Sequence, residues 1–241
     1  MRIRIITPIV IEKKSINEEQ DYIRSVRKLS GLCPETQLDS TSIIKGPSSI
    51  ESRYDEVLAN PDITKKILEA EKAGIDAVVI DCFGDPAVRA GRELVKIPVV
   101  AAGETAMLVA SSLCNKFSII TVLKNVIPLL EENAMTYGVK GKLVSVKAIN
   151  VPVLELDSNI DETVKALIEE GKKALVDDKA EILVLGCTGM TGLAERLSKA
   201  LNVYVVDPLP TAIKFAETLV SLNLSHSKIA FPQPPQKKRY D

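Results

Sequence analysis

The sequence predicts an α/β fold made of two similar α/β domains, whose parallel sheets are related by a pseudo-twofold axis. Three observations carry this prediction. Short runs of β-branched residues are apolar at nearly every position, as in strands that are buried on both faces. These runs alternate with longer segments of helical periodicity, which is the pattern of right-handed βαβ units. Similar landmarks also recur in the same order along the 241 residues.

The predicted elements follow one another in a regular order. We expect strands over six apolar runs: 3–10, 77–81, 99–103, 117–123, 182–186 and 203–207. We expect helices over six periodic segments: 16–30, 61–74, 104–114, 126–138, 160–178 and 209–223. Gly74 and Gly138 stand where two of these helices should end, because glycine readily adopts the conformation that closes a helix.

The internal repeat consists of pairs of similar segments in which the second member follows the first by 105 to 114 residues. The pairs are IIT at 5–7 and 119–121, Cys82 and Cys187, IPVV at 97–100 and VYVV at 203–206, and Thr-Ala at 105–106 and 211–212. Any α/β protein contains apolar strands, so coincidence is the alternative interpretation. The shared Cys-x-Gly pattern favours two related halves.

The two cysteines of the repeat define the expected site. We expect the first domain to contain residues 1–100 together with 209–241, and the second to contain residues 101–208. Ligands of open α/β sheets bind beyond the carboxyl ends of the strands. Cys82 and Cys187 each follow a strand end. Two facing halves would therefore place one thiol on each side of an interdomain cleft, which is the predicted active site.

Composition narrows the classes of function. The formal net charge is -1 and the sequence pI is about 6.0, whereas a general nucleic-acid binder usually has a basic face. The apolar start of the chain is too short to span a membrane. We therefore expect a cytoplasmic protein that binds a small molecule, with neither nucleic acid nor membrane as a partner. The Pro-rich, basic tail FPQPPQKKRY should be a solvated extension.

Metal and cofactor motifs are missing from the sequence. The chain has four cysteines, none of them in a CxxC pair, and a single histidine. This pattern indicates neither a Cys/His zinc site nor a disulfide framework. Neither a Walker motif nor GxGxxG follows the first strand, so no nucleotide cofactor is indicated. We expect no metal and no cofactor. A Cys-His hydrolase would have to use His226, which we expect at the surface.

Two opposed thiols suit the inversion of a carbon centre that carries an acidic C–H. One group removes the proton from one face while the other supplies a proton to the opposite face. A free thiol has a pKa of about 8.5, and a helix N-terminus can lower it. We therefore expect one thiolate and one thiol together near neutral pH. The backbone N–H groups near Gly84 and Gly189 would stabilise an enolate oxygen.

A structural role is the alternative for each cysteine, because free cysteine is often buried as a small apolar side chain. We keep that interpretation for Cys33, in the loop GLCPET, and for Cys114, in the helical segment SSLCNK. The symmetric placement of Cys82 and Cys187 favours chemistry at these two positions. A regulatory disulfide between them is less compatible with a reducing compartment.

Several segments resemble blocks of the aspartate/glutamate/hydantoin racemase superfamily, and within it the branch of hydantoin and allantoin racemases. The blocks are GPSSIESRYDE (46–56), DCFGDPAVRAGREL (81–94), VVAAGETAM (99–107), FSIITVL (117–123) and LGCTGMTGLAERL (185–197). The resemblance implies cofactor-independent racemisation at C5 of 5-substituted hydantoins, with allantoin as one candidate. It further implies that Cys82 and Cys187 act as acid and base, and that the protein is a homo-oligomer.

The residues beside the cysteines support this branch. Amino-acid racemases of the superfamily typically carry Cys-Asn-Thr at the first cysteine, whereas this chain has Cys-Phe-Gly at 82–84. A dicarboxylic amino acid would also want cationic partners. No Lys or Arg lies within three residues of either cysteine, although Lys124 follows a predicted strand.

A neutral cyclic diamide mainly needs hydrogen bonds and a shaped pocket. The substrate-binding residues that we expect are Thr7, Pro8, Ser49, Ile50, Phe83, Gly84, Thr121, Thr188 and Gly189. The chain departs from the branch in its first loop, which usually reads Asn-Pro-Asn and here ends in Ile9, a residue without a polar side chain. Two alternatives stay open. One is an aspartate or glutamate racemase, or a related isomerase or decarboxylase; the other is a non-catalytic, two-lobed binding protein.

Overall fold

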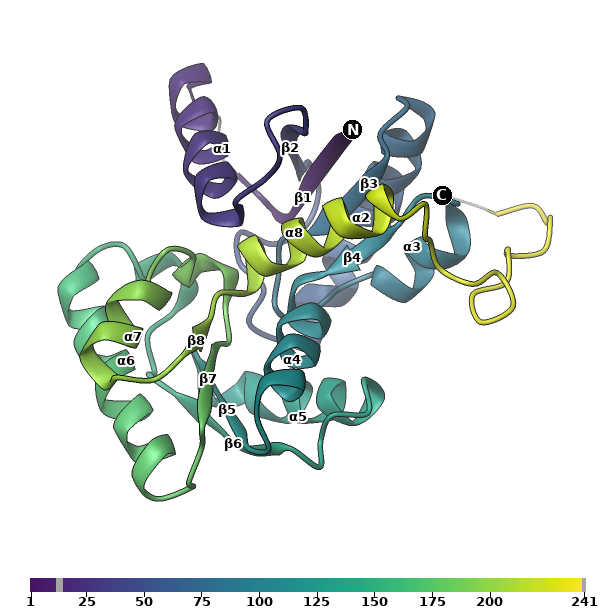
Figure 1. Cartoon of the computed structure of the whole chain (residues 1–241). Helices are drawn as coiled ribbons and strands as arrows, with labels where there is room; N and C mark the ends of the chain where they lie inside the picture. The colour runs from purple at the N-terminus through teal and green to yellow at the C-terminus, as the bar shows by residue number, and fades with distance from the viewer. Residues whose placement is uncertain (12–14, 240–241) are drawn as a thin grey trace.

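The computed structural model describes residues 1–11 and 15–239, which form two four-stranded parallel sheets flanked by helices (Figure 1). The first sheet has the order β2-β1-β3-β4, and the second has the order β6-β5-β7-β8. The strands are β1 (Arg2–Val10), β2 (Gln37–Ile43), β3 (Ala77–Ile80), β4 (Val99–Ala101), β5 (Phe117–Thr121), β6 (Leu143–Ala148), β7 (Ile182–Leu185) and β8 (Val205–Val206). The predicted α/β class is confirmed.

Helices connect successive strands in both halves. They are α1 (Ile16–Ser30), α2 (Arg53–Lys72), α3 (Val88–Leu94), α4 (Ala102–Leu113), α5 (Ile127–Thr136), α6 (Ile160–Val176), α7 (Ala194–Leu201) and α8 (Pro208–Ser221). Three short 3-10 helices are η1 (Lys124–Val126), η2 (Val153–Glu155) and η3 (Thr188–Met190). None of the helices in the described part of the chain combines the length and the apolar character needed to span a bilayer.

The prediction was incomplete at four elements and misplaced one helix start. Strands β2 and β6 and helices α3 and α7 were not predicted. Helix α2 begins at Arg53 rather than at 61, so Pro61 lies inside it. The physical reason is a cap further upstream, because the Ser52 hydroxyl accepts a hydrogen bond from the Asp55 N–H and so starts the helix.

Strand register shows that the two halves repeat. Ile6 pairs with Ile80 between β1 and β3, and Ile120 pairs with Leu185 between β5 and β7. The two pairs are related by the spacings of the IIT and cysteine repeats. Strand orders 2-1-3-4 and 6-5-7-8 match in the same way. The prediction of two similar halves is confirmed.

Each half gives its last helix to the other half. Helix α4 follows β4 of the first sheet, but Ala106 and Met107 belong to the hydrophobic core of the second sheet. Helix α8 follows β8 of the second sheet, but Ala212 and Ile213 pack in a core with Ile5 of β1. Figure 1 shows α8 lying across the first sheet. This exchange brings the carboxyl ends of the two sheets to a common region; the domain boundaries themselves stay a prediction.

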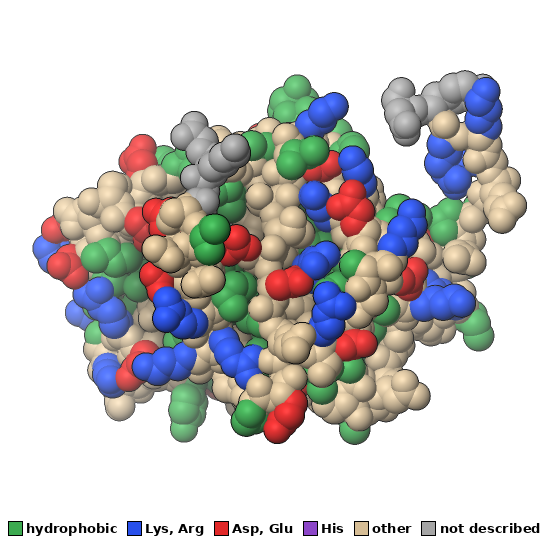
Figure 2. Space-filling model, turned by 90° about the horizontal axis from the view of Figure 1, so that it is seen from above, with side chains coloured by type: hydrophobic (Ala, Val, Ile, Leu, Met, Phe, Trp, Pro, Cys, Tyr) green, Lys and Arg blue, Asp and Glu red, His purple; other side chains and the backbone are tan. Residues whose placement is uncertain are grey.

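The segment after α8 is anchored against the first half before it leaves the body. His226 is half-buried rather than a surface residue: its Nε2 accepts a hydrogen bond from the Val99 N–H at 3.1 Å. Burial, reinforced by Arg92, lowers the pKa of His226 to about 4. Lys228 donates to the carbonyl of Arg92. Beyond Phe231 the chain extends away from the body and carries exposed Lys and Arg side chains (Figure 2).

Candidate functional site

A cavity of about 750 Å³ lies where strand ends of both sheets meet. Its wall includes residues that end or follow β1 and β3 of the first sheet and β5 and β7 of the second. This volume falls in the range of small-molecule sites. The site therefore lies between the two halves, beyond the carboxyl ends of parallel strands, as the fold predicts.

The two repeat cysteines take equivalent positions in this cavity. Cys82 stands two residues after the end of β3, and Cys187 stands two residues after the end of β7. Both strands are fully buried and apolar, so each fixes the residue that leaves its carboxyl end. All four cysteines of the chain are free thiols. The fold thus brings one thiol from each half into one cavity.

The expectation that the surroundings lower the thiol pKa was wrong. Burial raises the pKa of Cys187 to about 12, although the Gly189 N–H, 3.3 Å from its sulfur, opposes the shift. Burial also raises the pKa of Cys82 well above its ordinary value, against a hydrogen bond from the Gly84 backbone. The reason is that neither cysteine opens a long helix, since Cys187 precedes only the three-residue η3. Desolvation therefore outweighs the local dipoles.

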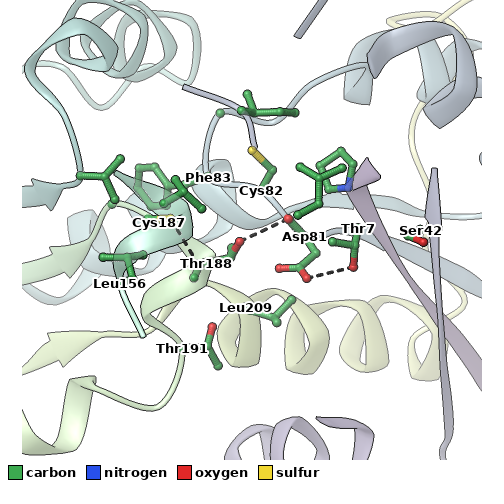
Figure 3. A pocket seen from close by; sticks show the side chains of 18 of the residues that line it. Thr7, Ser42, Asp81, Cys82, Phe83, Leu156, Cys187, Thr188, Thr191 and Leu209 are labelled. Atoms are coloured by element: carbon green, nitrogen blue, oxygen red, sulfur yellow. Dashed lines mark hydrogen bonds between the residues drawn. The ribbon is translucent and has the colours of Figure 1, made fainter. Parts of the chain in front are cut away.

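Two threonines hold equivalent places in the two halves. The Thr7 hydroxyl donates to Asp81 Oδ2 at 3.2 Å, and the Thr121 hydroxyl donates to the Gly186 carbonyl at 3.1 Å. Thr188 donates to the Asp81 carbonyl at 3.2 Å, so Thr7 and Thr188 approach Asp81 from opposite sides (Figure 3). These hydroxyl protons are used within the protein, which leaves the hydroxyl oxygens to accept hydrogen bonds.

Most of the expected site residues lie in the cavity wall. Those that line it are Thr7, Pro8, Ile50, Cys82, Phe83, Gly84, Thr121, Cys187, Thr188 and Gly189. Ser49 is not among the lining residues, and its hydroxyl donates to Glu51 Oε2 at 3.3 Å. Ile9, the departure in the first loop, lines the cavity, whereas Lys124 does not.

Sequence reasoning missed the acidic side chains of the cavity. Asp81, which precedes Cys82, accepts hydrogen bonds from the hydroxyls of Thr7 and, at 2.9 Å, Tyr22. Glu56 of α2 is 7 % exposed, and burial raises its pKa to about 7 against the opposing charge of Arg53. The segment GPSSIESRYDE contains Glu56, but nothing in its pattern distinguishes this acid from Asp55.

The charged side chains that line the cavity, among the described residues, are all acidic. Glu19, Glu56, Asp81 and Asp157 line the cavity, and none of its described lining residues is Lys, Arg or His. Among the residues that the structure describes, no three His, Cys, Asp or Glu side chains are grouped to hold a metal ion. Such a wall suits a neutral ligand that carries N–H donors and disfavours a dicarboxylate.

Comparisons with known proteins agree on one family. The sequence model for Asp/Glu/Hydantoin racemase matches residues 20–216. A hydantoin racemase from Pseudomonas sp. strain NS671 is 38% identical over 206 residues, which cover 86% of this chain and 83% of the relative.

Two solved structures share the fold over the full length of this chain. Allantoin racemase from Klebsiella pneumoniae has a TM-score of 0.90 and 32% identity, covering 100% of this chain and 96% of the other. Allantoin racemase from Pseudomonas fluorescens has a TM-score of 0.90 and 29% identity, covering 100% of both chains.

Proposed function

The chain belongs to the Asp/Glu/hydantoin racemase family, and on this premise we propose that it racemises 5-substituted hydantoins, with allantoin among the candidate substrates. The observation that carries the proposal is the placement of Cys82 and Cys187 at equivalent strand ends in one cavity that has no cationic lining residue among those described. Relatives named hydantoin racemase and allantoin racemase support the same substrate class.

The proposed reaction needs only the two cysteines as proton carriers. The thiolate of one takes the C5 proton, so the C5–H bond breaks and an S–H bond forms. The ring carbonyl beside C5 takes up the negative charge as an enolate. The thiol of the other cysteine then gives its proton to the opposite face of C5. Each turnover leaves the two cysteines with exchanged protonation states, and the reverse reaction uses them in the opposite order.

The wall of the cavity supports a neutral cyclic substrate over aspartate or glutamate. A dicarboxylate inside the cavity would face Glu56 and Asp81 and would have to reach beyond the wall for a cation. A related isomerase or decarboxylase acting on a carboxylate meets the same difficulty. The binding-protein alternative lacks a reason for two thiols at matched positions.

We propose in addition that the protein works as a homo-oligomer in the reducing cytoplasm, with the domain division 1–100 plus 209–241 and 101–208. Four free cysteines support the reducing compartment. Tyr54, Val57 and Leu58 support association, because these exposed apolar side chains are neighbours on one face of α2. Sedimentation of the purified chain tests this assembly: a single species of 26.2 kDa would contradict it.

The function is tested by proton exchange in D₂O. Single enantiomers of 5-benzylhydantoin and of allantoin are followed by NMR at C5 and by polarimetry. Wild type should lose optical rotation as deuterium enters C5. Cys82→Ser and Cys187→Ser should each abolish racemisation, whereas Cys114→Ser, which changes a cysteine outside the cavity, should match wild type.

Each other outcome has a definite meaning. If wild type is inactive on both hydantoins but exchanges the Cα proton of aspartate or glutamate, the activity is that of an amino-acid racemase. Binding of a hydantoin without exchange would favour the binding protein. Full racemisation by either serine variant would exclude the two-cysteine mechanism.

A further inference from the structure

Glu56 is a buried acid at the cavity whose two oxygens have different surroundings. Oε2 faces Arg53 Nη1 at 3.5 Å, where the Arg53 side chain is half exposed. Oε1 is buried, and no hydrogen bond to it is present among the described residues. A buried carboxylate oxygen without a partner costs free energy, so a site that keeps one has a use for it.

The position of Oε1 relates it to Cys82 through Gly84. A Cβ built on Gly84 would stand 2.7 Å from Glu56 Oε1 and 3.7 Å from Cys82 Sγ. Gly84, Cys82 and Glu56 all line the cavity. Because residue 84 has no side chain, the carboxylate can rest against the backbone of the loop that carries the first thiol. The acid is therefore a neighbour of the atom that exchanges the C5 proton in the proposed reaction.

The other deep carboxylate of the cavity, that of Asp81, is already engaged. The Asp81 carboxylate accepts hydrogen bonds from Thr7 and Tyr22. The charged groups that act on Glu56 are Arg53, which favours its ionised form, and Glu132 and Asp55, which oppose it. Glu56 Oε1 is a buried oxygen without a hydrogen-bond partner among the described residues, whereas neither oxygen of Asp81 is in that condition.

We propose that Glu56 is a specificity-determining residue whose carboxylate accepts a hydrogen bond from the ring N–H bonded to C5 of the substrate. This inference rests on the proposed hydantoin racemase activity. The N1–H of a hydantoin is attached to the reacting carbon, so a substrate with C5 against Cys82 presents N1–H to a group beside that thiol. N3–H lies across the ring and has no such neighbour. A turn of the carboxylate about χ3, a soft torsion, aims an oxygen at the substrate.

The test uses methylated substrates with matched variants. Single enantiomers of 5-benzylhydantoin, its 1-methyl derivative and its 3-methyl derivative are racemised by wild type, Glu56→Leu, Glu56→Gln and Glu132→Gln. Each kcat/KM is divided by the buffer-catalysed racemisation rate of the same compound, which removes the intrinsic effect of methylation on C–H acidity. Glu132 is the control, because it is the second carboxylate paired with Arg53 and lies outside the cavity wall.

Wild type and Glu132→Gln should process the 1-methyl compound about 10- to 100-fold less efficiently than the 3-methyl compound, the effect of a lost hydrogen bond to a buried charged group. In Glu56→Leu the two methyl compounds should become equivalent within about threefold. Glu56→Gln should keep part of the preference, since its amide oxygen is still an acceptor. Melting curves confirm that the variants are folded.

Equal normalised kcat/KM values of wild type for the two methyl compounds would overturn the inference, and this result needs no variant. The inference is also overturned if Glu56→Leu keeps the full preference for the 3-methyl compound. In both cases racemisation of unmethylated 5-benzylhydantoin would leave the proposed function intact. Wild type that is inactive on the unmethylated compound would instead reject the proposed function, and the role of Glu56 with it.

Discussion

Replacing Asp85 by alanine should destabilise the protein, because this side chain joins the loop after β3 to the second half. Its carboxylate accepts hydrogen bonds from the Gly103 N–H at 2.8 Å, the Glu104 N–H at 2.7 Å and the Tyr137 hydroxyl at 2.7 Å. Helix α4 has no cap from its own N-cap residue, Ala101. Asp85 thus supplies that cap from another part of the chain, and its loss leaves one buried and two partly buried donors without this acceptor.

The expected cost is the sum of two known effects. Loss of a helix N-cap costs about 1 kcal/mol, and an unsatisfied buried hydroxyl costs about 1–3 kcal/mol. We expect Asp85→Ala to lower the free energy of unfolding by about 2–4 kcal/mol, or the Tm by about 10 °C for a chain of this size. Tyr137→Phe, which removes the hydroxyl alone, should cost about 1 kcal/mol.

Urea denaturation followed by circular dichroism measures both variants and their double mutant. Burial raises the pKa of Asp85 to about 7, above its value of about 4 in an unfolded chain. The folded protein holds this proton more tightly, so the stability that Asp85 contributes falls as pH rises towards 7. The difference between wild type and Asp85→Ala should therefore be larger at pH 5 than at pH 8. A cost below about 1 kcal/mol at both pH values would refute this reasoning.

Burial raises the pKa of the Cys187 thiol to about 12, so the fraction of thiolate should grow with pH. The kcat/KM for racemisation, measured by polarimetry, should therefore rise about tenfold per pH unit from pH 6.5 to 8.5. A flat profile would show that the thiolate is already formed. Gly186→Ala should lower the free energy of unfolding in urea by about 1–3 kcal/mol, since its Cβ would stand 2.7 Å from Ile119 Cγ2. Gly141→Ala is the control and should be neutral, because its Cβ would have nothing within 4 Å. Equal stabilities of the two variants would contradict the clash. His226 has a pKa lowered to about 4 by burial, so its protonation favours the unfolded chain below about pH 6.5. Between pH 7 and 5 the Tm of wild type should thus fall more than that of His226→Gln, and parallel falls would disprove the coupling.

The sequence predicted the elements whose pattern comes from burial alone. Strands β3 and β7 are apolar at every position because helices cover both of their faces. The missed strands β2 (QLDSTSI) and β6 (LVSVKA) lie at sheet edges, where half-exposed positions accept Ser, Asp and Lys. Their strand character comes from pairing with β1 and β5, which is a tertiary effect and leaves little trace in local composition.

The candidate site divides in the same way. Cys82 and Cys187 could be found because the repeat places them at matched strand ends. Glu56 could not, since its role depends on the close approach of its carboxylate to Gly84, which is a contact between α2 and a distant loop. The thiol pKa was also beyond sequence reasoning, because it depends on how deeply the assembled cavity buries the sulfur and on which acids surround it.

The acids of the cavity bear on a requirement that any racemase must meet. Two enantiomers have equal free energy in water, so kcat/KM must be the same for both hands, and each thiol takes the C5 proton from one enantiomer and supplies it to the other. The repeat does not give the two thiols identical surroundings, because Asp81 in the first half corresponds to Gly186 in the second. Burial is the main cause of the raised pKa of both thiols, and two acids add to it at each: Asp85 and Glu56 at Cys82, and Asp81 and Glu51 at Cys187. All four acids belong to the first half of the chain, so a sequence that is asymmetric between the halves still gives each thiol a buried place with two acids near it.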